Sequence, residues 1–512
     1  MPRAELTDAE LSRLRTVMVA AGYTVDGVAG ALSPTAHAAL GRGERVPALR
    51  ETDGDDRPLA TLVRLMLLGT AEPPAAVAAA LGGLPVDRAV EAGLLAAAPG
   101  GALRAALDVR PYGDPSLPWY VVSDQGSGAG RGDGMDGAAG AIRADHVLGV
   151  GGASLTLAHA TVRRPVSTAL DVGTGCGVQA LHLSTHAAHV VATDSNPRAL
   201  ALARMTAALS ATAPWELVEG DLLAPVRERR FDLVVSNPPF VVGPSARFAY
   251  RDSGLPGDEV SRQLVTGAPE LLADGGIAVL LANWLHRAGE PWDERVRGWL
   301  DGAGCDALAV QREMQDPAEY AELWLRDGGE HGGGSGTAAY ERLYGEWLDW
   351  FAAERIEAVG FGIVVLRRTG ARPASVRVEH LPQPLEPPLG PVLDGWLRRV
   401  DALRGADLLR LAPAVAPGVR LDQRATAGAG GWEVVEQSLV QTGGLRRSGA
   451  VDGFGAALLA GCDGTVPLGA LVPVLAAGYG LDADEVLPGV LAAVRELAEQ
   501  GFLVIDAPRS SG

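Results

Sequence analysis

The sequence predicts an α/β fold in which helices cover both faces of a mostly parallel, doubly wound sheet. Short apolar segments alternate with helical segments between residues 167 and 368, a rhythm typical of such sheets. Glycine, proline or acidic residues follow several of the apolar segments, at the strand ends where these folds bind ligands. The chain of 512 residues is too long for one ordinary hydrophobic core, so we expect further domains on either side of the sheet.

Local composition justifies each predicted element. Strand segments are short apolar runs, whereas helical segments are longer and repeat apolar residues every three or four positions. A late helical segment is rich in aromatic residues, whose near-helical spacing favours a place in the core over an aromatic substrate wall. The predicted strands are 168–172, 189–193, 216–218, 231–235, 277–281 and 362–366, and the predicted helices are 178–188, 197–209, 258–272 and the aromatic-rich 338–353.

The two ends of the chain are predicted to be mainly helical. Three helices followed by a glycine turn and a short strand, within residues 59–109, suggest a winged helix, although a generic helical cap fits equally well. A similar pattern recurs after residue 453, where Pro488 should break or kink the third helix, 483–500. We therefore divide the chain into domains 1–120, 121–368 and 369–512, and expect winged-helix-like folds in the first and last.

Composition excludes several classes of function. The net charge of −18 lowers the expectation of nucleic acid binding, because polyanions are repelled unless positive charge is concentrated on one face. Lysine is absent, which excludes a Schiff-base lysine and a Gly-Lys-Ser/Thr phosphate loop in this chain. Cys176, Cys305 and Cys462 are widely separated, which argues against a disulfide framework or a zinc site, and we expect no metal.

The location of the protein is predicted from what the sequence lacks. The first residues show no basic-then-apolar signal pattern. No apolar run approaches the ~20 residues needed to cross a bilayer. We therefore expect a cytoplasmic protein without a membrane partner, and the sequence does not indicate its oligomeric state.

The first motif is a glycine-rich turn between a predicted strand and a predicted helix. Asp171, Gly173, Gly175 and Gly177 alternate along it, and the third glycine comes one residue too early for the Gly-x-Gly-x-x-Gly of dinucleotide folds. Such a turn lets backbone approach a ligand closely.

Acidic residues follow the next two predicted strands. Asp194 ends one of them, where a carboxylate commonly grips ribose hydroxyls, and Asp221 follows the other. Asp194 could instead cap the helix that begins near Pro197. Acids at successive strand ends suit a ribose and an adenine amine better than a pyrophosphate, which they would repel.

The second motif is Asn237-Pro238-Pro239-Phe240, directly after the strand 231–235. The Asn237 side-chain oxygen and the Pro238 carbonyl can accept both N–H bonds of a planar amide or nucleobase amine. The two prolines stiffen the loop, and Phe240 can stack on a flat substrate. Read alone, the motif could equally be an ordinary tight turn. Its position after the glycine turn and two acids favours a clamp, by which we mean two oxygens that hold the N–H bonds of a planar amide or amine.

Together these residues resemble the class I S-adenosylmethionine-dependent methyltransferases that carry an (Asn/Asp)-Pro-Pro-(Tyr/Phe) motif. The resemblance covers roughly residues 140–368 and implies a Rossmann-like sheet. Within that group the chain is most similar to release-factor glutamine methyltransferases and small-domain ribosomal RNA methyltransferases. Phe in place of Tyr at 240 leans slightly toward the ribosomal RNA members.

The resemblance implies roles for the motif residues. The turn from Asp171 through Gly173, Gly175 and Gly177 would pack against the methionine part of S-adenosyl-L-methionine. Asp194 would bind the ribose, and Asp221 would lie beside the adenine. Asn237, Pro238 and Phe240 would be the catalytic residues.

Four functions stay open at this point. The first is N-methylation of a protein glutamine, with a release-factor-like protein as partner, which the acidic charge slightly favours. The second is methylation of an exocyclic nucleobase amine in ribosomal RNA or DNA, with the flanking modules docking the nucleic acid. The others are a small-molecule methyltransferase and a non-catalytic binding protein.

Overall fold

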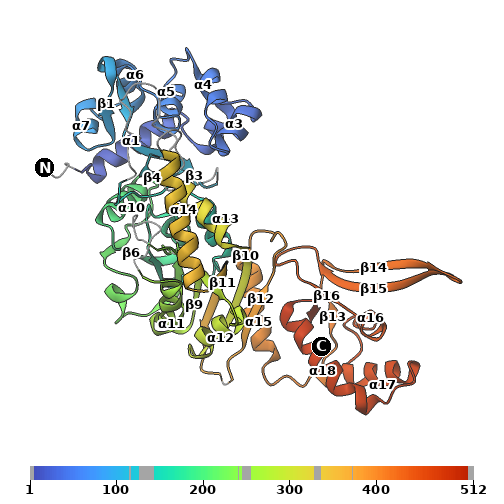
Figure 1. Ribbon diagram of the computed structural model, residues 1–512. Coiled ribbons are helices and arrows are strands. Elements are labelled where there is room, and N and C mark those ends of the chain that lie inside the picture. The colour runs from blue at the N-terminus through green and yellow to red at the C-terminus, as the bar shows by residue number, and fades with distance from the viewer. Residues whose placement is uncertain are drawn as a thin grey trace. The chain divides into compact units, whose positions relative to one another are not determined.

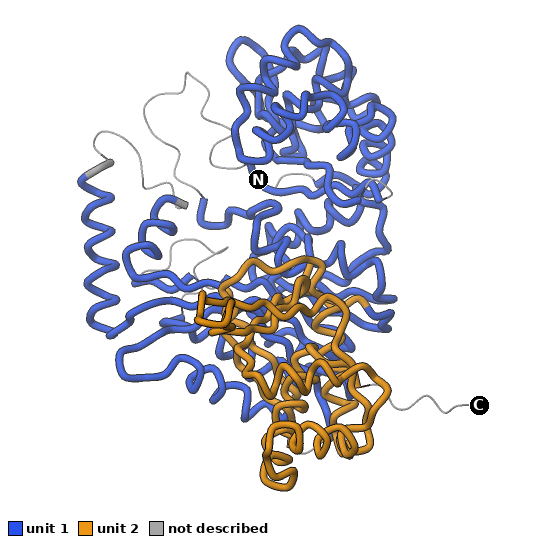
Figure 2. The backbone as a smooth tube through the Cα atoms, turned by 90° about the vertical axis from the view of Figure 1, so that its right-hand side faces the viewer, with its two compact units in different colours: residues 1–158, 164–304, 313–370 blue, residues 159–163, 305–312, 371–512 orange. Residues whose placement is uncertain are grey.

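The computed structural model describes residues 5–114, 117–125, 143–239, 241–244, 255–327, 336–371 and 373–505. The chain separates into two compact units, coloured in Figure 2. The first comprises residues 1–158, 164–304 and 313–370, and the second comprises residues 159–163, 305–312 and 371–512. Figure 1 follows the elements along the chain.

The first unit is built on the predicted sheet, whose strands follow one another in the order β11-β9-β8-β5-β6-β7. Neighbours from β9 to β7 run parallel, and β11 pairs antiparallel with β9. This confirms the α/β fold class. The strands are β5 (Val166–Val172), β6 (Ala187–Asp194), β7 (Glu216–Glu219), β8 (Phe231–Ser236), β9 (Leu272–Arg287) and β11 (Ile356–Arg368).

Three of the four predicted helices, 197–209, 258–272 and 338–353, lie close to observed helices, and three further helices, α8, α12 and α13, were not predicted. The predicted helix 178–188 is too long, because the chain turns after Leu183 and Ala187 already pairs with Val166 in the sheet. The helices are α8 (Gly152–Ala160), α9 (Val178–Leu183), α10 (Pro197–Leu209), α11 (Glu259–Leu271), α12 (Trp292–Asp301), α13 (Pro317–Asp327) and α14 (Gly336–Ala353).

The aromatic side chains of α14 belong to a core, as predicted. Trp347 and Phe351 are buried and pack with Tyr320 of α13 and with Val241 and Val242. The Tyr320 hydroxyl accepts a hydrogen bond from the backbone N–H of Val242 at 2.9 Å. The cluster therefore supports the segment that follows the Asn-Pro-Pro motif.

The N-terminal part of the first unit is mainly helical and ends in a β-hairpin. Helix α5 is followed by an isolated bridge between Glu72 and Leu103, then α6, α7 and the antiparallel pair β1–β2. This order suits a winged helix, which stays a prediction. The elements are α1 (Asp8–Ala20), α2 (Val25–Ala31), α3 (Pro34–Gly41), α4 (Val46–Thr52), α5 (Pro58–Leu62), a π-helical turn (Val63–Leu67), α6 (Pro74–Leu81), α7 (Val86–Glu91), β1 (Leu95–Ala97), β2 (Leu103–Ala105), β3 (Leu107–Tyr112) and β4 (Trp119–Asp124).

Helix α10 joins this helical part to the sheet. The Thr206 hydroxyl accepts the N–H of Val122 in β4, and Ser210 Oγ accepts the N–H of Tyr120. The Arg15 guanidinium of α1 donates to the carbonyl of Leu209 at 2.8 Å. These bonds use polar groups of a buried helix face that would otherwise be unpaired.

The second unit has its own hydrophobic core, formed mainly by leucine and valine from α16, α17, α18 and neighbouring strands. Figure 1 shows the β14–β15 hairpin extending away from the helices of this unit. The elements are β10 (Cys305–Gln315, of which 305–312 lie in this unit), β12 (Val376–His380), α15 (Gly390–Leu403), β13 (Ala414–Val415), β14 (Val419–Gly428), β15 (Gly431–Gln441), β16 (Ser448–Ala450), α16 (Gly453–Ala460), α17 (Leu468–Gly478), α18 (Ala483–Gln500) and β17 (Leu503–Val504).

Of the predicted break or kink at Pro488, the break is wrong, because α18 runs unbroken from Ala483 to Gln500, and the kink stays a prediction. Its buried residues Val490, Val494 and Ala498 lie in the core. Packing of that face therefore outweighs the backbone hydrogen bond that proline removes.

Candidate functional site

The register of the sheet brings the two motifs together. Val172 of β5 pairs with Ser236 of β8 on one side and with Thr193 of β6 on the other. The Ser236 hydroxyl also donates to the carbonyl of Val172 at 2.8 Å. The glycine turn, Asp194 and Asn237 each begin one residue beyond these paired positions, so the three loops start side by side at the carboxyl edge.

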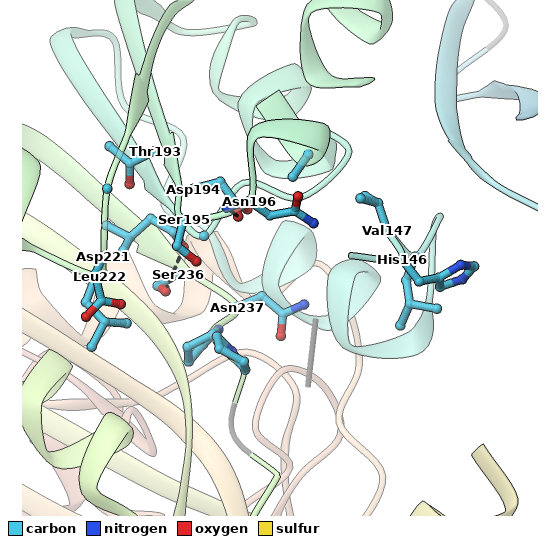
Figure 3. A pocket seen from close by; sticks show the side chains of 17 residues that line it. His146, Val147, Thr193, Asp194, Ser195, Asn196, Asp221, Leu222, Ser236 and Asn237 are labelled. Carbon is cyan, nitrogen blue, oxygen red and sulfur yellow. Dashed lines mark hydrogen bonds between the residues drawn. The ribbon is translucent and has the colours of Figure 1, made fainter. Parts of the chain in front are cut away.

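A cavity of about 100 Å³ lies at this edge. Five predicted site residues line it: Gly173, Asp194, Asp221, Asn237 and Pro238. Figure 3 shows Asp194 above Asp221 and Asn237, with Ser236 between the latter two. The remaining lining residues are His146, Val147, Leu148, Val172, Thr193, Ser195, Asn196, Ala199, Gly220, Leu222, Ser236 and Pro239.

Asp171 stabilises the glycine turn by hydrogen bonds from within the protein core. It is fully buried, and its Oδ2 accepts hydrogen bonds from the Thr174 hydroxyl at 2.7 Å and the Ala180 N–H at 3.1 Å. Its Oδ1 is buried without a hydrogen-bond partner among the described residues. Burial raises the pKa of Asp171 to about 7, against the lowering effect of those two donors.

Asp194 is positioned by the backbone of the same turn. Its Oδ2 accepts the N–H of Gly175 at 2.8 Å, and its Oδ1 accepts the N–H of Asn196 at 2.9 Å. Burial raises its pKa, and these N–H donors oppose that rise. The N-cap of α10 is Asn196, so the capping role that Asp194 might have had belongs to its neighbour.

The three glycines occupy different surroundings. Gly173 and Gly175 have φ angles of +71° and +55°, and a Cβ atom on either would meet no atom within 4 Å. A Cβ on Gly177 would lie 2.6 Å from the Trp215 ring. Of the three, Gly173 lines the cavity, Gly175 orients Asp194, and Gly177 makes room for Trp215.

The clamp loop begins at Asn237, whose Oδ1 is buried and has no hydrogen-bond partner among the described residues. Asn237 and Pro238 also line a second cavity, of about 280 Å³, between the glycine turn, the start of α8 and Trp324 of α13. None of the described side chains that line this second cavity is charged. Phe240 lies outside the described residues, so its stacking role stays a prediction.

A segment before α8 covers the first cavity with His146, Val147 and Leu148, on the other side from Asp221 in Figure 3. Asp124 at the end of β4 holds it: its Oδ2 accepts the Val147 N–H at 3.0 Å.

Arg198 of α10 forms an ion pair with the same Asp124 carboxylate. Burial would raise the pKa of Asp124, but the Arg198 guanidinium and the Val147 N–H hold it below its usual value. Burial lowers the pKa of His146, so its imidazole is neutral at neutral pH.

Among the lining residues, Gln179 carried no recognisable signal in the sequence. It lies outside both motifs, on helix α9, and only the three-dimensional structure places it at a cavity. Thr193 ends a predicted strand and Ser236 directly follows one, so strand position indicates both.

Comparison with known proteins agrees with this geometry. Residues 150–290 match the methyltransferase small domain. This part of the chain is a class I methyltransferase domain. Two further family matches flank it, both domains of unknown function: DUF7059 over residues 20–106 and DUF7782 over residues 394–505.

Three curated relatives match 22–30% of this chain. The release factor glutamine methyltransferase of Deinococcus radiodurans is 40% identical over 156 residues, covering 26% of this chain and 54% of that protein. The ribosomal protein uL3 glutamine methyltransferase of Bradyrhizobium diazoefficiens is 32% identical over 170 residues, covering 30% and 52%. The ribosomal RNA small subunit methyltransferase C of Alcanivorax borkumensis is 30% identical over 114 residues, covering 22% and 31%.

The chain thus spans about half the length of the first of these relatives that it matches. Neither flanking region of the chain is explained by them. Within the described ranges, no helix is long and apolar enough to cross a membrane, and no three His, Cys, Asp or Glu side chains group as metal ligands would.

Proposed function

We propose that the chain is an S-adenosylmethionine-dependent N-methyltransferase whose acceptor is the side-chain amide of a protein glutamine. The observation that carries this proposal is the buried Asn237 Oδ1, which lacks a hydrogen-bond partner among the described residues. A buried oxygen without a hydrogen-bond donor destabilises the protein. An N–H group of the substrate's glutamine amide would donate to it.

The residues present fit the cofactor. Open space in front of Gly173 admits a ligand against the backbone, and Asp194 and Asp221 line the same cavity. We propose that Asp194 binds the ribose hydroxyls and that Asp221 lies beside the adenine. The cofactor supplies an electrophilic methyl group on a sulfonium.

The chain's contribution to transfer is orientation. Asn237 Oδ1 and the Pro238 carbonyl accept the two N–H bonds of the amide, which turns the nitrogen toward the methyl group. The prolines at 238 and 239 restrict the loop, and Phe240 stacks on the amide plane. The methyl–sulfur bond of the sulfonium would break as the N–C bond forms, leaving a thioether. The amide proton becomes acidic only as nitrogen gains positive charge and would then leave to solvent, so the reaction needs no strong base beforehand.

The relatives named for glutamine methylation support an amide over a nucleobase. A nucleobase amine is the second candidate, because a relative is named for ribosomal RNA methylation and the same clamp accepts any planar amine.

The test is incubation of the purified protein with methyl-labelled S-adenosylmethionine and fractionated cell extract. We expect label in protein, at glutamine, and about a 100-fold loss of transfer in Asn237→Ala, with cofactor affinity by calorimetry within about twofold of wild type. Label found only in RNA would show that the methyl acceptor is a nucleobase and not a protein glutamine. Equal transfer by wild type and Asn237→Ala would refute the role of Asn237 in orienting the substrate amide.

A further inference from the structure

Gln179 is a buried polar residue that neither motif explains. It is the second residue of α9 and is 5% exposed. Its Nε2 donates to the carbonyl of Ser154 in α8 at 2.8 Å. Its Oε1 is buried and has no hydrogen-bond partner among the described residues. The NH₂ group of this amide therefore joins two helices, while its oxygen has no partner in the part of the chain that the structure describes.

The hydrogen bond to Ser154 fixes which way the amide faces. A backbone carbonyl can only accept, so the NH₂ group of Gln179 must point at it and the oxygen must point elsewhere. The unused atom is thus an acceptor, and the group that satisfies it must be a donor. Carboxylate and phosphate groups are excluded as partners of this atom.

Gln179 also lines the second cavity, together with Gly173, Thr174, Asn237 and Pro238. The adjacent Ala180 donates its N–H to Asp171, so Gln179 stands at the end of the turn that Asp171 begins. A donor group bound at this turn would lie in the same cavity as the Gln179 side chain.

We infer that Gln179 Oε1 accepts a hydrogen bond from the α-ammonium of the cofactor's methionine part, an assignment that rests on the proposed function. Two acceptors, Asn237 Oδ1 and the Pro238 carbonyl, already match the two N–H bonds of an acceptor amide. An ammonium brings three further donors. Among the described residues, no charged side chain lines the cavity, so neutral oxygens such as Gln179 Oε1 are the acceptors that these residues offer.

Ligand binding without turnover tests this inference. The probes are S-adenosylhomocysteine, which has the amino-acid end, and methylthioadenosine, which lacks it. Gln179→Met keeps the length of the side chain and removes both amide functions, while Gln179→Glu keeps an acceptor. By calorimetry we expect Gln179→Met to lose about tenfold in affinity for S-adenosylhomocysteine and less than twofold for methylthioadenosine. Gln179→Glu should retain the affinity for S-adenosylhomocysteine.

Each other outcome overturns the inference. Equal losses for both probes in Gln179→Met would show a purely structural role between α8 and α9. Unchanged affinity for both, with a raised KM for the methyl acceptor, would assign the oxygen to the acceptor amide. Failure of the wild-type chain to bind either probe would refute the cofactor itself, and is distinguishable because it does not depend on Gln179.

Discussion

Two glycines of the turn after β5 are expected to matter for different properties: Gly173 mainly for cofactor affinity and Gly177 mainly for the stability of the fold. Gly173→Ala places a methyl group into open space beside the cavity, at a φ of +71°, so we expect a loss of about 1–2 kcal/mol in unfolding free energy and at least about a tenfold loss of cofactor affinity. Gly177→Ala drives a methyl group to 2.6 Å from Trp215. The strain and the overpacking should together cost about 3 kcal/mol.

Urea denaturation and calorimetry of the two variants give the comparison. Trp215 cannot easily move away, because its Nε1 donates to the Ser184 hydroxyl at 2.8 Å. The order of stability should therefore be wild type, Gly173→Ala, Gly177→Ala. The order of affinity, measured on folded protein, should place Gly173→Ala last. Matching orders in the two measurements would contradict this division of roles.

Asp171 makes the stability of the ligand-free protein depend on pH. Burial raises its pKa from 3.8 to about 7 in the folded state. The folded protein therefore keeps a proton that the unfolded chain releases between these values, and stability falls as pH rises through this window. Asp171→Asn can keep the two hydrogen bonds that Oδ2 accepts and places an NH₂ where the unpartnered Oδ1 lies.

We expect the unfolding free energy of Asp171→Asn to exceed that of wild type at about pH 8, and the difference to vanish near pH 4. Urea denaturation at a series of pH values measures it, and the subtraction cancels the other titrating groups. Parallel pH profiles for the two proteins would show that Asp171 is ionised throughout the range.

Among the elements, α10 links the cavity cover to the N-terminal helices. Arg198 pairs with Asp124, which holds the segment that covers the first cavity. Arg198→Ala should lower the unfolding free energy by about 1.5–3 kcal/mol and weaken cofactor binding about fivefold, because the cover loses its support. Thermal unfolding and calorimetry measure both effects.

Arg204→Ala is the matched control on the same helix. Its guanidinium bonds Asp8 and the Leu6 carbonyl, which do not line the cavity, and the Asp8 partner is 83% exposed. It should change stability by less than about 1 kcal/mol and leave the cofactor affinity unchanged. Equal effects of Arg198→Ala and Arg204→Ala on cofactor affinity would contradict the hypothesis that the Arg198–Asp124 ion pair supports the cofactor cavity.

The sequence predicted the parts of the fold that depend on local patterns. Helix α10 begins and ends as predicted, because Asn196 caps it and Pro197 starts it. Helix α9 was predicted too long, since pairing of Ala187 with Val166 overrides local helical preference. Gln179 had no sequence signal, because its importance arises from a contact with Ser154 of a different helix.

At the scale of the molecule, the second unit is assembled from separate stretches of chain. Residues 307–311 of β10 pair in parallel with residues 376–380 of β12. Asp306 is fully buried and bonds both the Ser375 N–H and the Arg404 guanidinium. The stretch 305–312 thus takes two of its partners, β12 and Arg404, from residues beyond 370.

A chain cut after residue 370 should therefore not retain the stability of the intact protein. It leaves the buried carboxylate of Asp306 without its cation, which alone costs about 3–5 kcal/mol, and removes the partner strand β12. We expect a lower melting temperature, increased aggregation and weaker binding of S-adenosylhomocysteine. In the full chain, Arg404→Ala should reproduce much of the loss, whereas Arg410→Ala, whose side chain is 87% exposed, should not. A fragment that melts and binds like the intact protein would instead support residues 369–512 as an independent domain.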